Sequence, residues 1–225
     1  MKQIRTILAD DHMIVREGLH ALLDVDGGIE VVAEAHDGRE AVELTKLHRP
    51  EVVVMDIAMP ILNGIEAARQ IHTLFPSIKV IILSAHSDDA YIDRVVEIGA
   101  VGFLVKQTSA QILAKTIRLV AAGGTYYSPS IAKRVEESHR KPGAIGTLSA
   151  LKSTSLTARE QEVIQLVAEG QANKQVASAL NISIKTVEKH RQNLMDKLNI
   201  HDTAGLTRYA IAHGIIESSV QVTIV

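Results

Sequence analysis

The stretch Val52–Gly64, VVVMDIAMPILNG, places a single acidic side chain directly after four apolar residues. Three of the four are β-branched, which is typical of a strand buried on both faces of a parallel sheet. Asp56 follows at the carboxyl end of this strand, and Asn63-Gly64 has the composition of a turn before a helix. Because ligands of open α/β sheets bind at the carboxyl ends of strands, Asp56 is a candidate for a chemical role.

Strand-like apolar runs alternate with helical segments on both sides of this stretch. Such alternation predicts a parallel sheet with helices on both faces, and the doubly wound order 2-1-3-4-5 would make the first and third strands neighbours. The five predicted strands are Ile4–Ala9, Ile29–Ala35, Val52–Met55, Val80–Leu83 and Val101–Val105. The predicted helices are Asp11–Leu23, Arg39–His48, Ile65–Leu74, Ala90–Ile98 and Ala110–Ala122.

Polar side chains follow four of these strands: Asp10 and Asp11, then Asp56, then Ser84, and finally Lys106. Three carboxylates in one crevice repel each other unless a cation is present, and oxygen ligands suit a hard ion, Mg²⁺ or Mn²⁺. A lysine and a hydroxyl beside that ion would suit a phosphoryl group. Asp56 is then the expected nucleophile, because aspartate forms acyl-phosphates in phosphoryl transfer.

Each of these residues also has a simpler interpretation when it is taken alone. Asp10 or Asp11 could cap the first helix, because Asp is a favoured N-cap residue. Ser84 could be a turn residue and Lys106 a solvated charge. The functional interpretation depends on all five residues standing at the same end of successive strands.

Composition and charge restrict the classes of function. The 225 residues include no Cys, which excludes disulfides and thiolate metal sites, and no Trp. The amino terminus does not have the pattern of a signal peptide, and no apolar run is long enough for a membrane span, so we expect a cytoplasmic protein that does not bind membranes. Residues 1–124 carry 12 Lys and Arg against 17 Asp and Glu, which argues against nucleic-acid binding there, whereas residues 154–225 are neutral.

The second half of the chain has a different organisation. Ser128-Pro129 predicts the start of a short helix through about Ser138, and residues 139–155 have the composition of a flexible linker. Thr157 and Glu160 form a capping box for the next helix. Two helices, Asn173–Leu180 and Ile184–Leu198, are joined by a three-residue turn, which predicts a helix-turn-helix motif, and a last helix spans about Thr203–His213.

The helix 184–198 has one apolar and one polar face at 3.6 residues per turn. We expect the core face to comprise Ile184, Val187, Leu194, Met195 and Leu198. The opposite face carries Lys185, Glu188, Lys189, Gln192 and Asp196. A polar face is usually only solvated, but the second helix of a helix-turn-helix enters the major groove, where Lys, Gln and Glu can read base edges. Arg191 lies near the apolar stripe and could reach a phosphate.

Asp10-Asp11, the run Met55-Asp56-Ile57-Ala58-Met59-Pro60, Asn63-Gly64, Ser84-Ala85 and Lys106 resemble a response-regulator receiver domain. The resemblance implies that Asp56 accepts phosphate from a sensor histidine kinase, and that Asp10, Asp11, Asp56 and the backbone carbonyl of Ile57 hold the metal. It also implies a conformational switch that involves Ser84 and Phe103. Two residues depart from the family pattern: Phe103 replaces a switch residue that is often Tyr, and Gln107 stands where many receivers have a cis-proline.

Residues 156–214 are similar to a LuxR-type helix-turn-helix, through Leu156-Thr157-Ala158-Arg159-Glu160 and Ile184-Lys185-Thr186-Val187-Glu188-Lys189-His190. Receiver and helix-turn-helix together resemble the NarL/FixJ family of transcription regulators. This resemblance implies a dimer that forms on phosphorylation, often through the last helix, and that acts on promoter DNA and RNA polymerase. The DNA contacts that we expect are Lys174, Lys185, Thr186, Glu188, Lys189, His190, Arg191 and Gln192, although Glu188 stands where many members carry a basic residue.

The interpretation that we favour is a transcription regulator controlled by Mg²⁺-dependent phosphorylation of Asp56, not an enzyme acting on other substrates. The predicted domains are a receiver at residues 1–123, a linker with a short helix at 124–154, the helix-turn-helix at 155–216 and a tail at 217–225. Two alternatives stay open: a pseudo-receiver that binds DNA constitutively, and a Mg²⁺-dependent phosphatase with aspartyl-phosphate chemistry.

Overall fold

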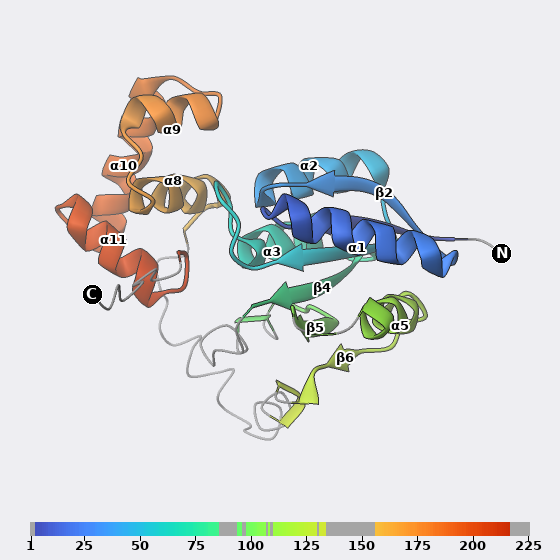
Figure 1. Ribbon diagram of the computed structural model, residues 1–225. Coiled ribbons are helices and arrows are strands. Elements are labelled where there is room, and N and C mark those ends of the chain that lie inside the picture. The colour runs from blue at the N-terminus through green and yellow to red at the C-terminus, as the bar shows by residue number, and fades with distance from the viewer. Residues whose placement is uncertain are drawn as a thin grey trace, which may run out of the picture. The chain divides into compact units, whose positions relative to one another are not determined.

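The computed structural model describes residues 3–85, 94–95, 98–106, 108, 110–129, 131–133 and 156–216 (Figure 1). The chain divides into two compact units, with the division between residues 153 and 154. Most of the predicted helix Ala90–Ile98, together with Gln107, the predicted linker 139–155 and the tail, lies outside the described residues. Among those residues, no helix has both the length and the apolar composition needed to cross a membrane.

The first unit contains a parallel sheet with the order β2-β1-β3-β4-β5-β6, which confirms the predicted doubly wound order of the first five strands. The apolar run Val52–Met55 forms most of β3, a buried strand in the middle of this sheet. Its strands are β1 (Ile4–Ala9), β2 (Ile29–Ala35), β3 (Val52–Asp56), β4 (Lys79–Ser84), β5 (Gly102–Val105) and β6 (Tyr126–Tyr127). Its described helices are α1 (Met13–Asp26), α2 (Gly38–His48), α3 (Gly64–Leu74) and α5 (Ala110–Ala121).

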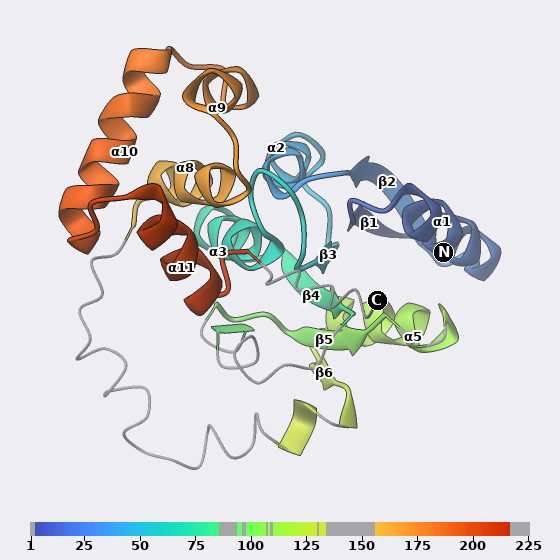
Figure 2. The same cartoon turned by 60° about the vertical axis from the view of Figure 1, so that its left-hand side comes forward.

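Helices cover both faces of the sheet, as Figure 2 shows for this unit. On one face, α2 and α3 pack against the side chains of alternate strand residues, among them Ile7, Val53 and Phe103. On the other face, α1 and α5 pack against the intervening residues, among them Leu8, Val54 and Leu104. Because both faces are buried, β3 and β4 each carry four consecutive apolar residues, Val52–Met55 and Val80–Leu83, which is the pattern that made β3 recognisable.

A sixth strand extends the sheet beyond the five that we predicted. Tyr126 and Tyr127 pair in parallel with Gly102 and Phe103 of β5. Ile131 then contributes a fully buried side chain to the core on the α2–α3 side. We expected residues 124–154 to form a linker with a short helix, whereas Tyr126 and Tyr127 pair with β5 and Ile131 is buried in the core of the first unit.

Side-chain N-caps open two helices of the first unit, α2 and α3. Asp37 accepts a hydrogen bond from the Glu40 backbone N–H at 2.8 Å, and Asn63 accepts one from the Glu66 N–H at 2.9 Å, as N-cap residues do. The start of α1 does not match the simpler interpretation of Asp10 or Asp11 as a helix cap. Its N-cap residue is His12, without a side-chain cap, so neither Asp10 nor Asp11 occupies the N-cap position.

The second unit contains four described helices, in agreement with the prediction: α8 (Ala158–Ala168), α9 (Asn173–Ala179), α10 (Ile184–Leu198) and α11 (Thr203–Ala212). The Thr157–Glu160 capping box is present, and Ser183 caps α10. Asn181 adopts a left-handed conformation (φ 53°) in the turn between α9 and α10, which Asn tolerates better than most residues. These two helices form the predicted helix-turn-helix.

The prediction is wrong for one residue of the core face of α10. Val187 and Leu194 are fully buried, and Met195 and Leu198 are half-buried. The side chain of Ile184, however, is 45% exposed. Ile184 is the first residue of the helix, and the buried contact begins almost one turn later, at Val187.

Candidate functional site

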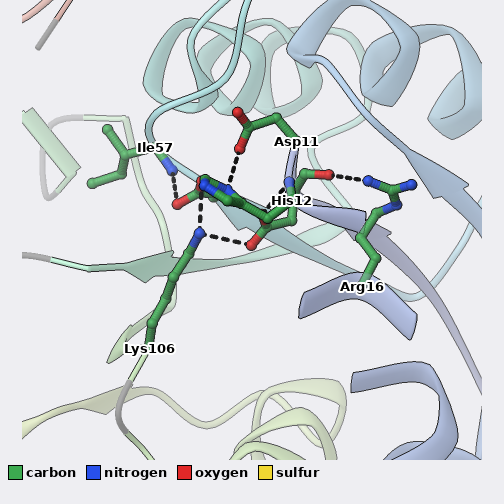
Figure 3. Close-up of polar contacts among 7 residues, drawn as sticks. Asp11, His12, Arg16, Ile57 and Lys106 are labelled. Atoms are coloured by element: carbon green, nitrogen blue, oxygen red, sulfur yellow. Dashed lines mark hydrogen bonds and ion pairs between the residues drawn. The ribbon is translucent and has the colours of Figure 1, made fainter. Parts of the chain in front are cut away.

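Sheet pairing brings the predicted acidic residues together. Ala9 of β1 lies opposite Met55 of β3, so Asp10 and Asp56 emerge side by side at the carboxyl ends of adjacent strands. Lys106 follows β5, and its Nζ lies 2.8 Å from Oδ2 of Asp10 and 2.9 Å from Oδ2 of Asp56 (Figure 3). Asp10 and Asp56 are almost fully buried. The lysine therefore joins the two carboxylates inside the crevice.

Backbone donors fix the orientation of both buried carboxylates. Oδ1 of Asp56 accepts a hydrogen bond from the Ile57 N–H at 2.9 Å. Oδ1 of Asp10 accepts one from the His12 N–H, also at 2.9 Å. Asp11 is more exposed, and its Oδ1 lies 2.7 Å from Nδ1 of His12. These contacts hold the acidic groups in place before any ligand binds.

Burial changes the ionisation of Asp56. It raises the pKa of Asp56 from 3.8 to about 6, although the hydrogen bond from Lys106 and its positive charge act in the opposite direction. Burial by itself would lower the pKa of Lys106, but its hydrogen bonds to Asp10 and Asp56 outweigh this effect and raise that pKa. Lys106 is therefore positively charged at neutral pH. Its single positive charge does not fully balance the negative charges of the buried acids.

The acidic cluster has the composition of a site for a hard cation. Asp10, Asp11, His12 and Asp56 each offer one atom, and these atoms lie within 4.8 Å of one another. Oδ2 of Asp10 is buried, and Lys106 is its only partner among the described residues. Carboxylate oxygens with this excess of negative charge fit Mg²⁺ or a similar ion. Sequence reasoning missed His12, although its place directly after Asp11 was a usable signal.

The backbone carbonyl of Ile57 does not fit its expected role as a metal ligand. Its oxygen accepts hydrogen bonds from the Gly64 N–H at 2.9 Å and from the Met59 N–H at 3.1 Å. Both lone pairs of this oxygen therefore have partners within the turn that follows β3. We leave Ile57 out of the cation site for this reason.

The two predicted switch residues lie on neighbouring strands. Ser84 is buried at the end of β4, and its carbonyl accepts the backbone N–H of Lys106 at 2.7 Å. Phe103 is completely buried in the core of the first unit, opposite Ile82 of β4 and Tyr127 of β6. Their role as a switch stays a prediction.

The predicted DNA-binding side chains differ in exposure. Five are exposed, namely Lys174, Lys185, Glu188, Lys189 and Gln192, whereas Thr186, His190 and Arg191 are half-buried. Gln192 donates to Asp196 within the same face at 2.8 Å. The hydroxyl of Thr186 lies 2.8 Å from that of Ser183. The exposed face of α10 thus presents long polar side chains of both charges.

Arg191 makes contacts within the second unit. Its Nη1 donates to Oδ1 of Asn173, the first residue of α9, at 2.8 Å. Its Nη2 donates to Oγ1 of Thr203, the first residue of α11, at 2.9 Å. These hydrogen bonds explain why Arg191 lies beside the apolar stripe, and they link α10 to the helices on either side of it in the sequence.

Together, these features define a class of protein. A parallel α/β unit carries an acidic pocket with one lysine, and a separate helical unit carries a helix-turn-helix motif. This combination is that of a signal-receiving domain joined to a DNA-binding domain.

Comparison with known families agrees with this class. Residues 6–118 match the family model of the response regulator receiver domain, and residues 154–210 match that of the LuxR family of bacterial regulatory proteins. The chain therefore belongs to the two-component response regulators with a LuxR-type DNA-binding domain, which are DNA-binding transcription regulators.

Individual proteins resemble the chain over almost its whole length. It is 35% identical to the transcriptional regulatory protein DegU of Brevibacillus brevis, with 96% of each chain covered. It is 39% identical to the transcriptional regulatory protein LiaR of Bacillus subtilis, with 92% of this chain and 96% of LiaR covered. Among solved structures, an RcsB–DNA complex matches with a TM-score of 0.56 and 26% identity, covering 94% of this chain and 99% of RcsB.

Proposed function

We propose that Asp56 is the phosphoacceptor of this regulator and that its phosphorylation controls DNA binding by the second unit. The observation that carries the proposal is the position of Lys106, whose Nζ lies within 2.9 Å of both Asp10 and Asp56 at the carboxyl edge of the sheet. A cation held in that position can pair with phosphoryl oxygens transferred to Asp56.

The chemistry that we propose is transfer from a phosphohistidine of a sensor kinase. A carboxylate oxygen of Asp56 forms the new O–P bond, the P–N bond breaks, and the imidazole leaves as the neutral ring after taking a proton from water. Lys106 pairs with the transferred oxygens, and the Ser84 hydroxyl donates to one of them. Asp56 must be ionised to attack, and a cation bound beside it would favour this ionised form.

Asp10, Asp11 and Asp56 would hold Mg²⁺ or Mn²⁺, which would neutralise charge on the transferred phosphoryl group. The buried Oδ2 of Asp10 and the excess of carboxylates support this assignment. In place of Ile57, we propose the carbonyl of Ala58 as a further ligand. Among the described residues it accepts no backbone hydrogen bond.

The output that we propose is promoter binding by a dimer, followed by contact with RNA polymerase. Lys174, Lys185, Glu188, Lys189 and Gln192 are the proposed DNA contacts on the exposed surface of the motif, with Thr186 and His190 beside them. The last helix, α11, is the proposed dimer contact. A dimer would read two half-sites of the promoter, whereas a monomer would read one. Phosphorylation would act as a population shift toward the DNA-binding state.

Intact-mass measurement after treatment with a small phosphodonor and Mg²⁺ tests the first part of the proposal. We expect one stable phosphoryl adduct on the wild-type chain and none on Asp56→Asn. Release of many phosphate ions per chain would instead favour the phosphatase alternative. The absence of any adduct would favour the pseudo-receiver.

DNA affinity before and after phosphodonor treatment tests the second part. We expect a gain for the wild-type chain and no gain for Asp56→Asn. An Asp56→Asn protein whose DNA affinity rises on treatment would show that another site carries the control.

A further inference from the structure

Arg16 contacts the acidic pocket from α1 without being one of its acidic or phosphate-binding groups. Its Nη1 donates to the main-chain carbonyl oxygen of Asp10 at 2.7 Å, as Figure 3 shows. Its Nε lies 3.3 Å from Oε2 of Glu34, next to the last residue of β2. The Arg16 side chain is only 15% exposed. The planar guanidinium therefore joins α1, β2 and the first residue after β1.

The Glu34 carboxylate that pairs with Arg16 is itself held in place. Oε1 of Glu34 lies 2.6 Å from Nδ1 of His20, which stands one helical turn after Arg16 on α1. Both carboxylate oxygens of Glu34 are thus engaged, one by Arg16 and one by His20. Because the guanidinium has a rigid fork of donors, fixing Glu34 also fixes the direction of the Nη1 donor.

Asp10 is held at each of its polar positions. Its N–H donates to the Ala35 carbonyl at 3.1 Å, and its Oδ1 accepts from the His12 N–H. Its Oδ2 pairs with Lys106. Arg16 supplies the remaining contact, to the main-chain carbonyl, and its side chain comes from α1. The carbonyl belongs to the peptide that joins Asp10 to Asp11.

We propose that Arg16 is a positioning residue for cation binding, which sets the Asp10–Asp11 peptide and so places both carboxylates for the ion. This inference depends on the proposed function, because it assumes that these acids bind Mg²⁺. Residues that orient metal ligands without touching the metal commonly change metal affinity 10- to 100-fold when they are mutated. Arg16 acts here through hydrogen-bond geometry and not through its charge, which would repel the cation.

The two possible roles of Arg16 predict opposite changes in Mg²⁺ affinity. If positioning dominates, loss of the guanidinium lets the Asp10–Asp11 peptide move, and Mg²⁺ binds more weakly. If charge repulsion dominates, loss of the guanidinium removes a positive charge next to the acids, and Mg²⁺ binds more tightly. The sign of the change therefore separates the two roles.

The test is a titration of the full-length chain with MgCl₂, in which the backbone amide NMR signals of Asp11 and Ile57 report Mg²⁺ binding. We expect the dissociation constant of Arg16→Gln to rise roughly tenfold. The matched control is Arg118→Gln, which removes an ion pair with Asp26 next to the amino end of β2, away from the acidic cluster. Its dissociation constant should equal that of the wild type. Arg16→Lys keeps the charge without the fork, and should lie between the wild type and Arg16→Gln.

Three results would overturn the proposal. The first is an Arg16→Gln protein whose spectrum shows the native fold, whose melting temperature falls and whose Mg²⁺ affinity is unchanged, because Arg16 would then be purely structural. The second is tighter binding by Arg16→Gln together with wild-type binding by Arg16→Lys, which would reduce the role of Arg16 to its charge. The third is a wild-type chain without any Mg²⁺-dependent shift, and only this result also removes the cation site from the proposed function.

Discussion

Tyr127 donates its hydroxyl hydrogen to the main-chain carbonyl oxygen of Ala100, 3.1 Å away. Burial raises the pKa of Tyr127, so the hydroxyl keeps its proton at neutral pH. Beside this contact, the Ser128 N–H donates to the Phe103 carbonyl at 2.9 Å. Side-chain and main-chain hydrogen bonds therefore attach β6 and the residue after it to the amino-terminal half of β5 and to Ala100, which precedes that strand.

Replacing Tyr127 with Phe should lower the free energy of unfolding of the first unit by about 1 kcal/mol, because the Ala100 carbonyl loses its donor. Urea unfolding monitored by circular dichroism measures this change. Tyr126→Phe is the matched control, because the Tyr126 hydroxyl makes no hydrogen bond to the described residues. Equal stabilities for the two variants would mean that the Tyr127 contact contributes nothing.

The ionisation of Asp56 should make stability depend on pH. Its folded pKa of about 6 lies above the ordinary value of 3.8, so protonation of Asp56 stabilises the fold at low pH. This contribution, roughly 3 kcal/mol for two pKa units, is lost as the pH rises through about 6. Asn cannot ionise, so Asp56→Asn should gain stability relative to the wild type between pH 5 and pH 7.5, by about 1 kcal/mol. Urea unfolding of both proteins in EDTA at the two pH values is the measurement, and a constant difference would contradict the raised pKa.

Replacing Lys106 with Gln should slow phosphorylation of Asp56 by a small phosphodonor by roughly a hundredfold, the usual effect of removing one charge-stabilising donor. The time course of the phosphoryl adduct by intact mass gives the rate. The same change removes a group that lowers the pKa of Asp56, so that pKa should rise further. Lys115→Gln, on the exposed side of α5, is a control that should react like the wild type. A Lys106→Gln rate within twofold of wild type would exclude Lys106 from the transfer step.

Arg191 and Lys189 should affect DNA binding in different ways. Arg191→Ala loses the hydrogen bonds to Asn173 and Thr203, so we expect the second unit to lose about 1–3 kcal/mol of stability. Lys189→Ala leaves stability unchanged, but lowers the slope of log affinity against log salt concentration by about one, as loss of a phosphate contact does. Binding assays at several salt concentrations, with thermal melts, distinguish the two. A reduced slope for Arg191→Ala would show that Arg191 also contacts a phosphate.

Much of the site could be predicted from local sequence. Asp10, Asp11, Asp56 and Lys106 were recognisable because each directly follows an apolar run, and parallel strands bring their carboxyl ends to one edge. The positions of α8 to α11 were predictable from caps and 3.6-residue periodicity, since these signals involve residues that are close in the chain.

Other features could not be predicted, because they depend on contacts between residues distant in sequence. The two residues of β6 carry no strand pattern of their own, and they form a strand only because the edge of β5 is available for pairing. The carbonyl of Ile57 is occupied by the N–H of Gly64, which requires the closed turn. The exposure of Ile184 depends on where its helix meets the rest of the unit, which periodicity does not reveal.

The class of this protein can be read from local sequence: the order of strands and helices, the carboxylate at Asp56 with its acidic and basic partners, and the helix-turn-helix. These follow from hydrophobic periodicity and from residues at the ends of elements. The contacts that hold those groups depend on the packing of distant elements. Lys106 between two carboxylates, Arg16 on the carbonyl of Asp10 and Arg191 between α9 and α11 each join elements that come together only when the cores pack. The physical reason is that periodicity records which face of an element is buried, whereas hydrogen-bond partners depend on where the buried faces meet.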